Sequence, residues 1–178
     1  MPALSTPVCE FGWKAQNFSL QSTRNEIIEL NKARGQNGTL IMFICNHCPY
    51  VVSALDEIIY EAKELIKNDI AVIAISSNDV STHPEDSFEN MQARMKEHKF
   101  PWDYLHDESQ EIATNYGALK TPHFFVFDSD RSLIYTGRGI DNPRNGSESK
   151  INDLENAIDD YLRGSDIAVP VTNPIGCN

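Results

Sequence analysis

The sequence lacks any run of about 18 apolar residues, the length that a helix needs to cross a bilayer. It also lacks a positively charged start followed by an apolar stretch, which is the pattern of a secretory signal peptide. Basic residues are few, with 15 Lys and Arg against 26 Asp and Glu and a net charge of −11. So acidic a chain is a poor ligand for nucleic acid or an anionic membrane. We therefore expect a cytoplasmic protein with neither of these partners.

Cysteine is scarce, with four residues among 178, too few for a secreted scaffold held together by disulfides. The sequence has no internal repeat and no low-complexity tract. Two of the cysteines form one CxxC motif, Cys45-Asn46-His47-Cys48, whereas Cys9 and Cys177 stand alone near the two ends. In a reducing compartment, a CxxC is more often redox-active or metal-binding than part of a structural disulfide.

What the sequence does contain predicts one α/β domain. Its composition, 40% hydrophobic and 23% charged, is typical of a globular protein of this length. Continuous apolar runs at 40–44 and 70–75 predict strands that are covered on both faces. Between them, apolar residues at spacings of three and four predict a helix that begins near Cys45 and ends near Lys67. This order predicts a right-handed βαβ unit with parallel strands.

The rest of the chain predicts further helices and strands. Thr82 and Glu85 form a capping-box pattern, and Asp107 precedes a second, shorter helix. The expected elements are a helix over 82–98, a short helix over 107–117, a hairpin of 123–127 and 133–136, a last helix over 151–162, and an extended or disordered tail from 165 onward. A CxxC at the strand-to-helix junction of the first βαβ unit is the arrangement of the thioredoxin fold.

The CxxC has the spacing that thiol-disulfide exchange requires. Residues i and i+3 on a helical turn face the same side, so Cys45 and Cys48 can form a disulfide. The start of a helix stabilises a thiolate and lowers a cysteine pKa from about 8.5 into the range of about 3.5–7.5. We therefore predict that Cys45 is the nucleophile, and that Cys48, one turn further along, is a more buried and less acidic resolving thiol.

His47 is the titratable neighbour of these thiols, because residues 40–55 contain no Lys, Arg, Asp or Glu. A protonated or hydrogen-bonding His47 would favour the thiolate. The other interpretation is a solvent-exposed spacer with little effect.

Zinc binding is the competing interpretation of the motif. A structural zinc site needs four ligands, usually as two paired halves. Cys45, Cys48 and His47 supply one half, but the sequence has no second CxxC, CxxH or HxxxH. We therefore expect no metal and no other cofactor.

Several segments resemble the peroxiredoxin-like branch of the thioredoxin superfamily, the redoxin or AhpC/TSA type. They are FICNHCPYV, ISSND, FPWDYLHDESQEIATNYGALKTPHFFVF, YTGRGID and the opening AQNFSL. The resemblance covers about 15–165. It implies a thioredoxin fold, with a central mixed β-sheet flanked by helices and a redoxin-type helical insertion. Residues 1–14 would then be an N-terminal extension and 166–178 an extended C-terminal tail.

The resemblance also implies roles for single residues. It implies a nucleophile at Cys45, a resolving partner at Cys48, and a cis peptide bond at Thr121-Pro122 that faces them. In thioredoxin-like proteins, the residue before that proline pairs its backbone with the extended substrate chain, so Thr121 and Pro122 are expected to bind substrate.

Three further residues are candidates for the site. Asn46 lies within the motif. His123 either touches substrate or is a half-exposed strand residue. Arg138 matches an arginine position of the family, and either contacts substrate or is a solvated turn residue.

The sequence departs from the family in two respects. Peroxiredoxin peroxidases carry PxxxTxxC, but the Thr and Pro positions are Met42 and Gly38 when counted from Cys45, and Cys45 and Ile41 when counted from Cys48. Thioredoxins bury an acid on the strand before the CxxC, and 40–44 contains none. The first departure counts against dedicated peroxide reduction, and the second against a thioredoxin-like proton relay.

Three functions follow from these observations. The first is a thiol-disulfide oxidoreductase that acts on a protein or small-molecule disulfide and is reset by an external thiol reductant. The second is a peroxidase, in which a peroxide oxidises Cys45 to a sulfenic acid that Cys48 resolves. The third is a binding module with an idle CxxC. Cys9 and Cys177 are either additional resolving or regulatory thiols, because family members often end in Gly-Cys, or thiols without a role, which is the interpretation that we favour.

A test of the His47 hypothesis is the reduction potential of the CxxC. A stabilised thiolate favours the reduced form, so we expect a midpoint above the roughly −270 mV of thioredoxin and closer to the value of about −180 mV of the isomerase. Equilibration against glutathione buffers measures it. A midpoint at or below the thioredoxin value would contradict the hypothesis.

Overall fold

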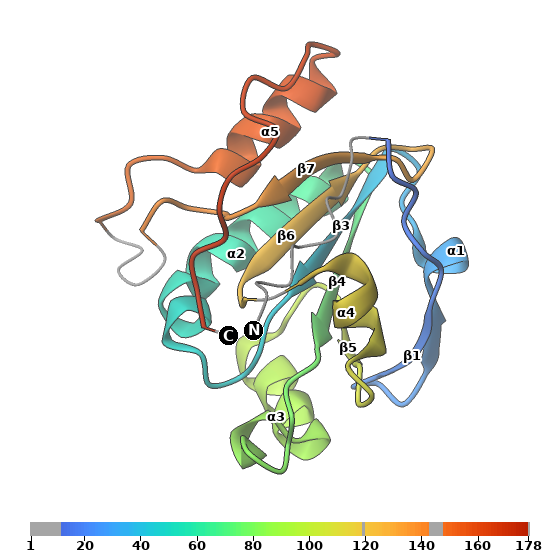
Figure 1. Ribbon diagram of the computed structural model, residues 1–178, viewed down its shortest axis with the longest axis vertical. Helices are drawn as coiled ribbons and strands as arrows, with labels where there is room; N and C mark the ends of the chain where they lie inside the picture. The colour runs from blue at the N-terminus through green and yellow to red at the C-terminus, as the bar shows by residue number, and fades with distance from the viewer. Residues whose placement is uncertain (1–11, 119, 143–147, 178) are drawn as a thin grey trace, which may run out of the picture.

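The computed structural model describes residues 12–118, 120–142 and 148–177 (Figure 1). Its strands are β1 (Ser19–Ser22), β2 (Ile27–Glu29), β3 (Gly38–Phe43), β4 (Ile70–Ser76), β5 (Asp103–His106), β6 (His123–Phe127) and β7 (Leu133–Gly137). Its helices are α1 (Leu30–Ala33), α2 (Pro49–Lys67), the 3₁₀ turn η1 (Pro84–Asp86), α3 (Phe88–His98), α4 (Glu111–Tyr116) and α5 (Asp153–Leu162). Within these residues the strands form one mixed sheet, in the order β2-β1-β5-β4-β3-β6-β7.

The predicted βαβ unit forms the middle of the sheet. Strands β3 and β4 are parallel, with Leu40 opposite Val72, and α2 connects them. Every residue of β3 is buried, which explains its unbroken apolar run. The predicted hairpin is also present, because β6 and β7 are antiparallel neighbours at one side of the sheet. These elements confirm the predicted α/β class.

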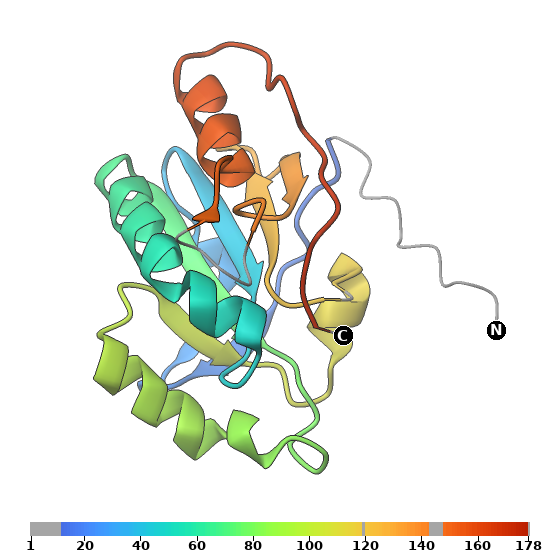
Figure 2. The ribbon, with the colours of Figure 1, turned by 90° about the vertical axis from the view of Figure 1, so that its left-hand side faces the viewer.

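Helices cover both faces of the sheet (Figure 2). Successive residues of β3 point to opposite faces, so Leu40 and Met42 pack in the layer under α2 and α5, and Ile41 and Phe43 pack in the other layer. In that second layer Tyr116 of α4 makes edge-on contacts, including one with Phe125 at 5.8 Å between ring centroids. Both faces of the sheet are thus covered by apolar layers. The polar residues considered below lie in the loops at the carboxyl ends of its central strands.

Helix α2 begins four residues later than predicted. Pro49 is its first residue, and Cys48 is the extended N-cap residue, with φ −61° and ψ 123°. A proline fits the first helical position because its missing N–H has no partner there, but it disfavours helical geometry in the residue before it. The expectation that the helix begins near Cys45 is therefore wrong, and both cysteines precede the helix.

The predicted capping box is also wrong. The Thr82 hydroxyl donates to the carbonyl of Asp79 instead of capping a helix. The 3₁₀ turn η1 follows, and α3 starts only at Phe88, where the Ser87 hydroxyl accepts from the amide of Asn90 at 3.2 Å. The short helix α4 likewise starts at Glu111, although Asp107 accepts hydrogen bonds from two amides of its first turn.

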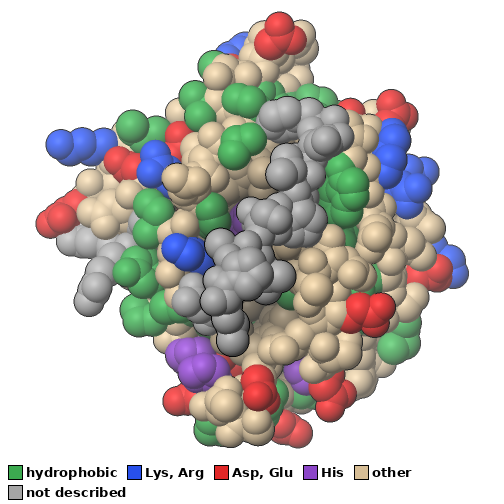
Figure 3. Space-filling model, viewed as in Figure 1, with side chains coloured by type: hydrophobic (Ala, Val, Ile, Leu, Met, Phe, Trp, Pro, Cys, Tyr) green, Lys and Arg blue, Asp and Glu red, His purple; other side chains and the backbone are tan. Residues whose placement is uncertain are grey.

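Within the described residues, no helix combines the length and the apolar character that a membrane crossing needs. Figure 3 shows Asp and Glu side chains around the rim of one face, with Lys and Arg in small groups among them.

A glutamate is buried between α2 and α5. Glu61 is only 6% exposed. Burial, together with the nearby carboxylates of Glu155 and Asp159, raises its pKa from 4.5 to about 7. Folding therefore favours the protonated form of this side chain.

A pH series on Glu61→Gln tests this linkage. The stabilisation due to protonated Glu61 is fully present below the pKa of the unfolded chain and is lost as the pH rises through about 7. Glutamine keeps the neutral shape, so we expect the variant to gain about 1–3 kcal/mol of unfolding free energy over the native protein at pH 8 and almost nothing near pH 4. Urea unfolding measures the difference, with Asp56→Asn, at an exposed position of the same helix, as control. A variant no more stable at pH 8 would contradict the assignment.

Candidate active site

The CxxC lies in the loop between β3 and α2, at the carboxyl end of the central strand. The loop begins as a continuation of β3, because the amide of Ile44 still donates to the carbonyl of Ile75. Both cysteines are thiols and both are buried, Cys45 at 2% and Cys48 at 0% exposure. The neighbouring loop before β6 covers them.

Thr121 is the residue of that loop that meets both sulfurs. Its hydroxyl lies 3.6 Å from Sγ of Cys45, and the Cys48 thiol donates to its carbonyl at 3.4 Å. The Thr121-Pro122 peptide bond is cis, as the family resemblance implied. The structure therefore brings four of the predicted site residues together.

The two thiols titrate as a pair. A hydrogen bond with Cys48, burial and the charge of Asp86 raise the pKa of Cys45. The same hydrogen bond lowers the pKa of Cys48 to about 4, helped by hydrogen bonds from the Cys177 and Thr121 side chains. The expectation that Cys45 is the more acidic thiol is thus reversed. Because α2 starts at Pro49, the positive end of the helix acts mainly on its N-cap residue, Cys48.

The main residue that the sequence analysis missed is Asp86 of η1. Its carboxylate is completely buried and accepts hydrogen bonds from the amide of Asn46 at 2.8 Å and the side chain of Asn78 at 2.7 Å. Nδ1 of His47 lies 2.6 Å from its second oxygen. A buried acid is therefore present, but it comes from the segment after β4 and not from the strand before the motif. No local sequence pattern distinguishes Asp86 as a site residue, because an acid in the first turn of a helix is common.

His47 is held by this carboxylate. Besides the contact with Asp86, its ring stacks on His83 with 4.6 Å between centroids. His47 is therefore not a solvent-exposed spacer. It pairs with an acid next to the thiols, while its effect on their pKa stays a prediction.

The remaining candidates have structural contacts. The Asn46 side chain donates to the carbonyl of Glu85 and accepts from the hydroxyl of buried Tyr104. His123 is buried, contrary to the half-exposed interpretation, and burial lowers its pKa to about 4. Arg138 is not a solvated turn residue either, because its Nε donates to Asp153 at 2.6 Å.

A metal would find an incomplete set of ligands here. One atom each of Cys45, His47 and Asp86 lie within 4.8 Å of one another. Three donors are one fewer than a closed structural zinc site uses. The Asp86 oxygens are also engaged by two asparagines and by His47. Among the described residues this arrangement fits a loop anchor better than a structural metal site.

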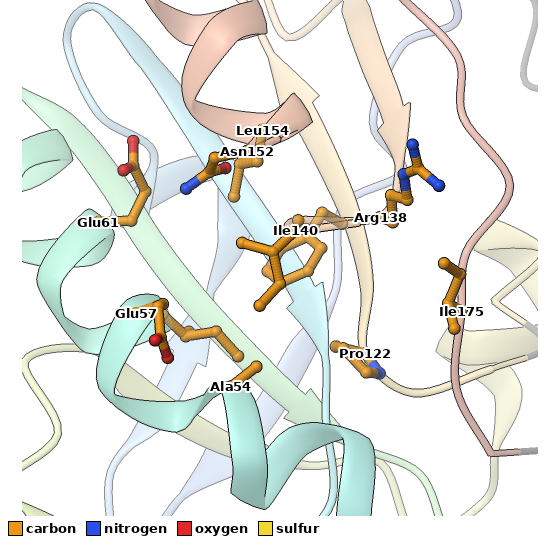
Figure 4. Close-up of a pocket in the computed structure, with 12 residues that line it drawn as sticks. Ala54, Glu57, Glu61, Pro122, Arg138, Ile140, Asn152, Leu154 and Ile175 are labelled. Carbon is orange, nitrogen blue, oxygen red and sulfur yellow. The ribbon is translucent and has the colours of Figure 1, made fainter. Parts of the chain in front are cut away.

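A small pocket adjoins Pro122 (Figure 4). Helix α2 supplies one wall, with the carboxylates of Glu57 and Glu61, and Ile140 and Leu154 supply apolar surface. Ile175, from the segment after α5, closes the side next to Pro122. The C-terminal segment is thus part of the wall around the site.

The fold defines a thioredoxin-like protein with a pair of thiols at the carboxyl end of its central strand. Comparison with family models identifies the particular family: residues 11–136 match the AhpC/TSA family, and the chain belongs to it. A search of the curated proteins gives no match.

Solved structures share the fold of this chain. An uncharacterized conserved protein from Geobacillus kaustophilus is 35% identical, with a TM-score of 0.89 over 99% of this chain and 95% of the other. A hypothetical protein from Sinorhizobium meliloti 1021 is 34% identical, with a TM-score of 0.87 over 94% and 92%. A putative thioredoxin from Neisseria meningitidis, 23% identical with a TM-score of 0.66 over 85% and 91%, shares the fold. The predicted thioredoxin fold is confirmed.

The charge of Asp86 can be tested on a single thiol. In a Cys48→Ser background, where Cys45 titrates without its thiol partner, we expect Asp86→Asn to lower the pKa of Cys45 by about one unit or more, because a nearby negative charge is removed. The pH dependence of alkylation of the Cys45 peptide measures this pKa. The exposed neighbour Glu85→Gln is the matched control. An unchanged pKa, or an equal shift in the control, would contradict the electrostatic role.

Proposed function

We propose that this protein is a thiol-disulfide oxidoreductase that works through Cys45 and Cys48. The convergence of both sulfurs on Thr121, next to the cis bond to Pro122, carries the proposal. It puts two thiols that can form a disulfide beside a backbone segment able to pair with an extended chain. Membership of the AhpC/TSA family supports a redox role.

The pair supplies both a nucleophile and a base. Cys45 is 2% exposed and Cys48 is fully buried, and a hydrogen bond joins the two thiols. When Cys45 attacks a substrate disulfide, its proton passes to the Cys48 thiolate, a mixed disulfide forms, and one substrate sulfur leaves as a thiolate. Cys48 then gives up its proton to that thiolate and attacks Cys45. The Cys45–Cys48 disulfide forms, and the second substrate sulfur leaves as a thiolate, which takes up a proton from water.

The substrate in this proposal is a protein or small-molecule disulfide. Two equivalents of an external thiol, oxidised to their own disulfide, return the enzyme to the dithiol. A reducing compartment such as the cytoplasm supplies this reductant.

Peroxide reduction is the second candidate, favoured by the family match alone. The positions of the peroxidatic Thr and Pro are Met42 and Gly38 relative to Cys45, which provide neither a hydroxyl nor a proline ring. The Thr121 hydroxyl lies 3.6 Å from the Cys45 sulfur, but it belongs to the loop before β6 and not to the peroxidatic position of the motif. We therefore rank disulfide exchange first.

The assay compares two substrates in a Cys9→Ser/Cys177→Ser background, so that only the thiols of the motif react. We expect reduction of an insulin disulfide at the expense of an external dithiol, with little consumption of hydrogen peroxide. Cys45→Ser should lower the rate at least about a hundredfold, because the attacking sulfur is lost. Cys48→Ser should accumulate a mixed disulfide on Cys45, which mass spectrometry of the intact protein detects.

The outcomes separate the three functions. Fast peroxide consumption with negligible insulin reduction would overturn the proposal in favour of a peroxidase. Inertness toward both substrates would favour the binding module. A mixed disulfide with insulin that accumulates in Cys45→Ser and not in Cys48→Ser would reverse the roles of the two cysteines.

A further inference from the structure

The C-terminal segment forms a strap, residues 165–177, that runs from α5 along the outer side of β7 toward the start of α2 (Figures 1 and 2). It is hydrogen-bonded to β7, since the amide of Thr136 donates to the carbonyl of Pro170 and the amide of Thr172 donates to the carbonyl of Thr136, both at 3.1 Å. The Thr172 hydroxyl also accepts from the amide of Arg138 at 2.9 Å. The strap is therefore extended, which is one of the two predicted alternatives, and it is hydrogen-bonded to β7 at 170 and 172.

Two glycines allow this strap to lie close to the domain. A Cβ added to Gly137 of β7 would lie 2.2 Å from the Thr172 hydroxyl oxygen, and one added to Gly176 would lie 1.8 Å from the carbonyl oxygen of Thr121. Neither position has room for a side chain. The two contacts occur at the middle and at the end of the strap, so the approach depends on glycine at both.

The strap ends on the active site. Cys177 forms an antiparallel bridge with Thr121. The amide of Thr121 donates to the carbonyl of Cys177 at 2.8 Å, and the amide of Cys177 donates to the carbonyl of Thr121 at 3.1 Å. This is the backbone edge that an extended substrate is expected to use. The same carbonyl accepts from the thiol of Cys48 at 3.4 Å, and the Cys177 side chain hydrogen-bonds to Cys48. The thiol of Cys48 and the backbone amide of Cys177, from distant parts of the chain, thus meet at one carbonyl.

We propose that Cys177 is a third reacting thiol of this site and a second resolving cysteine, which receives the disulfide from Cys45. The inference rests on the proposed function, and extends it. After substrate has left, the Cys177 thiolate attacks the sulfur of Cys48 in the Cys45–Cys48 disulfide. The Cys48–Cys177 bond forms, the Cys45–Cys48 bond breaks, and Cys45 leaves as a thiolate that takes up the proton released by Cys177. No external oxidant is consumed, because one disulfide replaces another.

This exchange has a consequence for the order of events. Substrate and the strap compete for the backbone of Thr121, so the strap returns when substrate has gone. The product of the exchange is a protein with a reduced Cys45 and a strap joined covalently to the site. The external reductant then acts on the Cys48–Cys177 disulfide.

The test uses oxidised glutathione and a Cys9→Ser background. In Cys45→Ser, we expect Cys48 and Cys177 to become an intramolecular disulfide with no glutathione retained, as peptide mapping by mass spectrometry would show. In Cys45→Ser/Cys177→Ser, glutathione should stay on Cys48. With Cys45 present, a Cys48–Cys177 linkage should be found beside Cys45–Cys48.

A variant of the strap tests whether its docked position, and not random collision of the two thiols, determines the rate of Cys48–Cys177 bond formation. Gly176→Ala cannot dock as described, so it should slow formation of the Cys48–Cys177 bond about tenfold or more and leave formation of Cys45–Cys48 unchanged. Asn173→Ala, at an exposed position of the same strap, is the matched control.

Two results would overturn the inference: glutathione retained on Cys45→Ser with no linkage to Cys177, or a linkage that forms equally fast in Gly176→Ala. The insulin assay on the same preparations keeps the two proposals apart. Normal insulin reduction with no Cys48–Cys177 bond would overturn this inference alone, whereas the bond without insulin reduction would overturn the proposed function.

Discussion

The rest of the site is arranged around Thr121, whose backbone and hydroxyl contact all three of its neighbouring cysteines. Its carbonyl accepts from the Cys48 thiol and from the amide of Cys177, its own amide donates to Cys177, and its hydroxyl lies beside Cys45. Three segments far apart in the sequence therefore meet at one residue: the loop before α2, the loop before β6 and the C-terminal strap. Each is placed by a different part of the sheet, so the geometry of the site is a property of the whole domain.

The start of α2 decides how charge is distributed over the two thiols. Because Pro49 opens the helix, its unpaired amides lie next to Cys48, while Cys45 is left closer to the buried carboxylate of Asp86. Both effects favour the thiolate on Cys48. An acid that anchors the CxxC loop by two contacts also favours the protonated form of Cys45, so structural support and reactivity are coupled through Asp86.

The sequence predicted the elements whose pattern is local and missed those defined by distant contacts. The buried run of β3 and the amphipathic spacing of α2 are visible in the residues themselves, and so was the CxxC at their junction. Strand β5 is only four residues long, and its ends, Asp103 and His106, are polar, so its pairing with β4 leaves no periodic signal. Asp86 was missed, and Cys177 was given no role, because the contacts of both residues with the site are made between segments that are distant in the sequence. The capping box at Thr82 failed because Asp79 offers its hydroxyl a nearer partner.

The strap also matters for the surface of the sheet. Strand β7 is one edge of the sheet, and an exposed edge strand offers unpaired backbone groups to any other extended chain. Both backbone groups of Thr136 that face outward are taken by Pro170 and Thr172. With the strap in place, these two backbone groups are not available for strand addition by a second molecule. The segment that reaches the paired thiols thereby also covers part of an edge strand of the sheet.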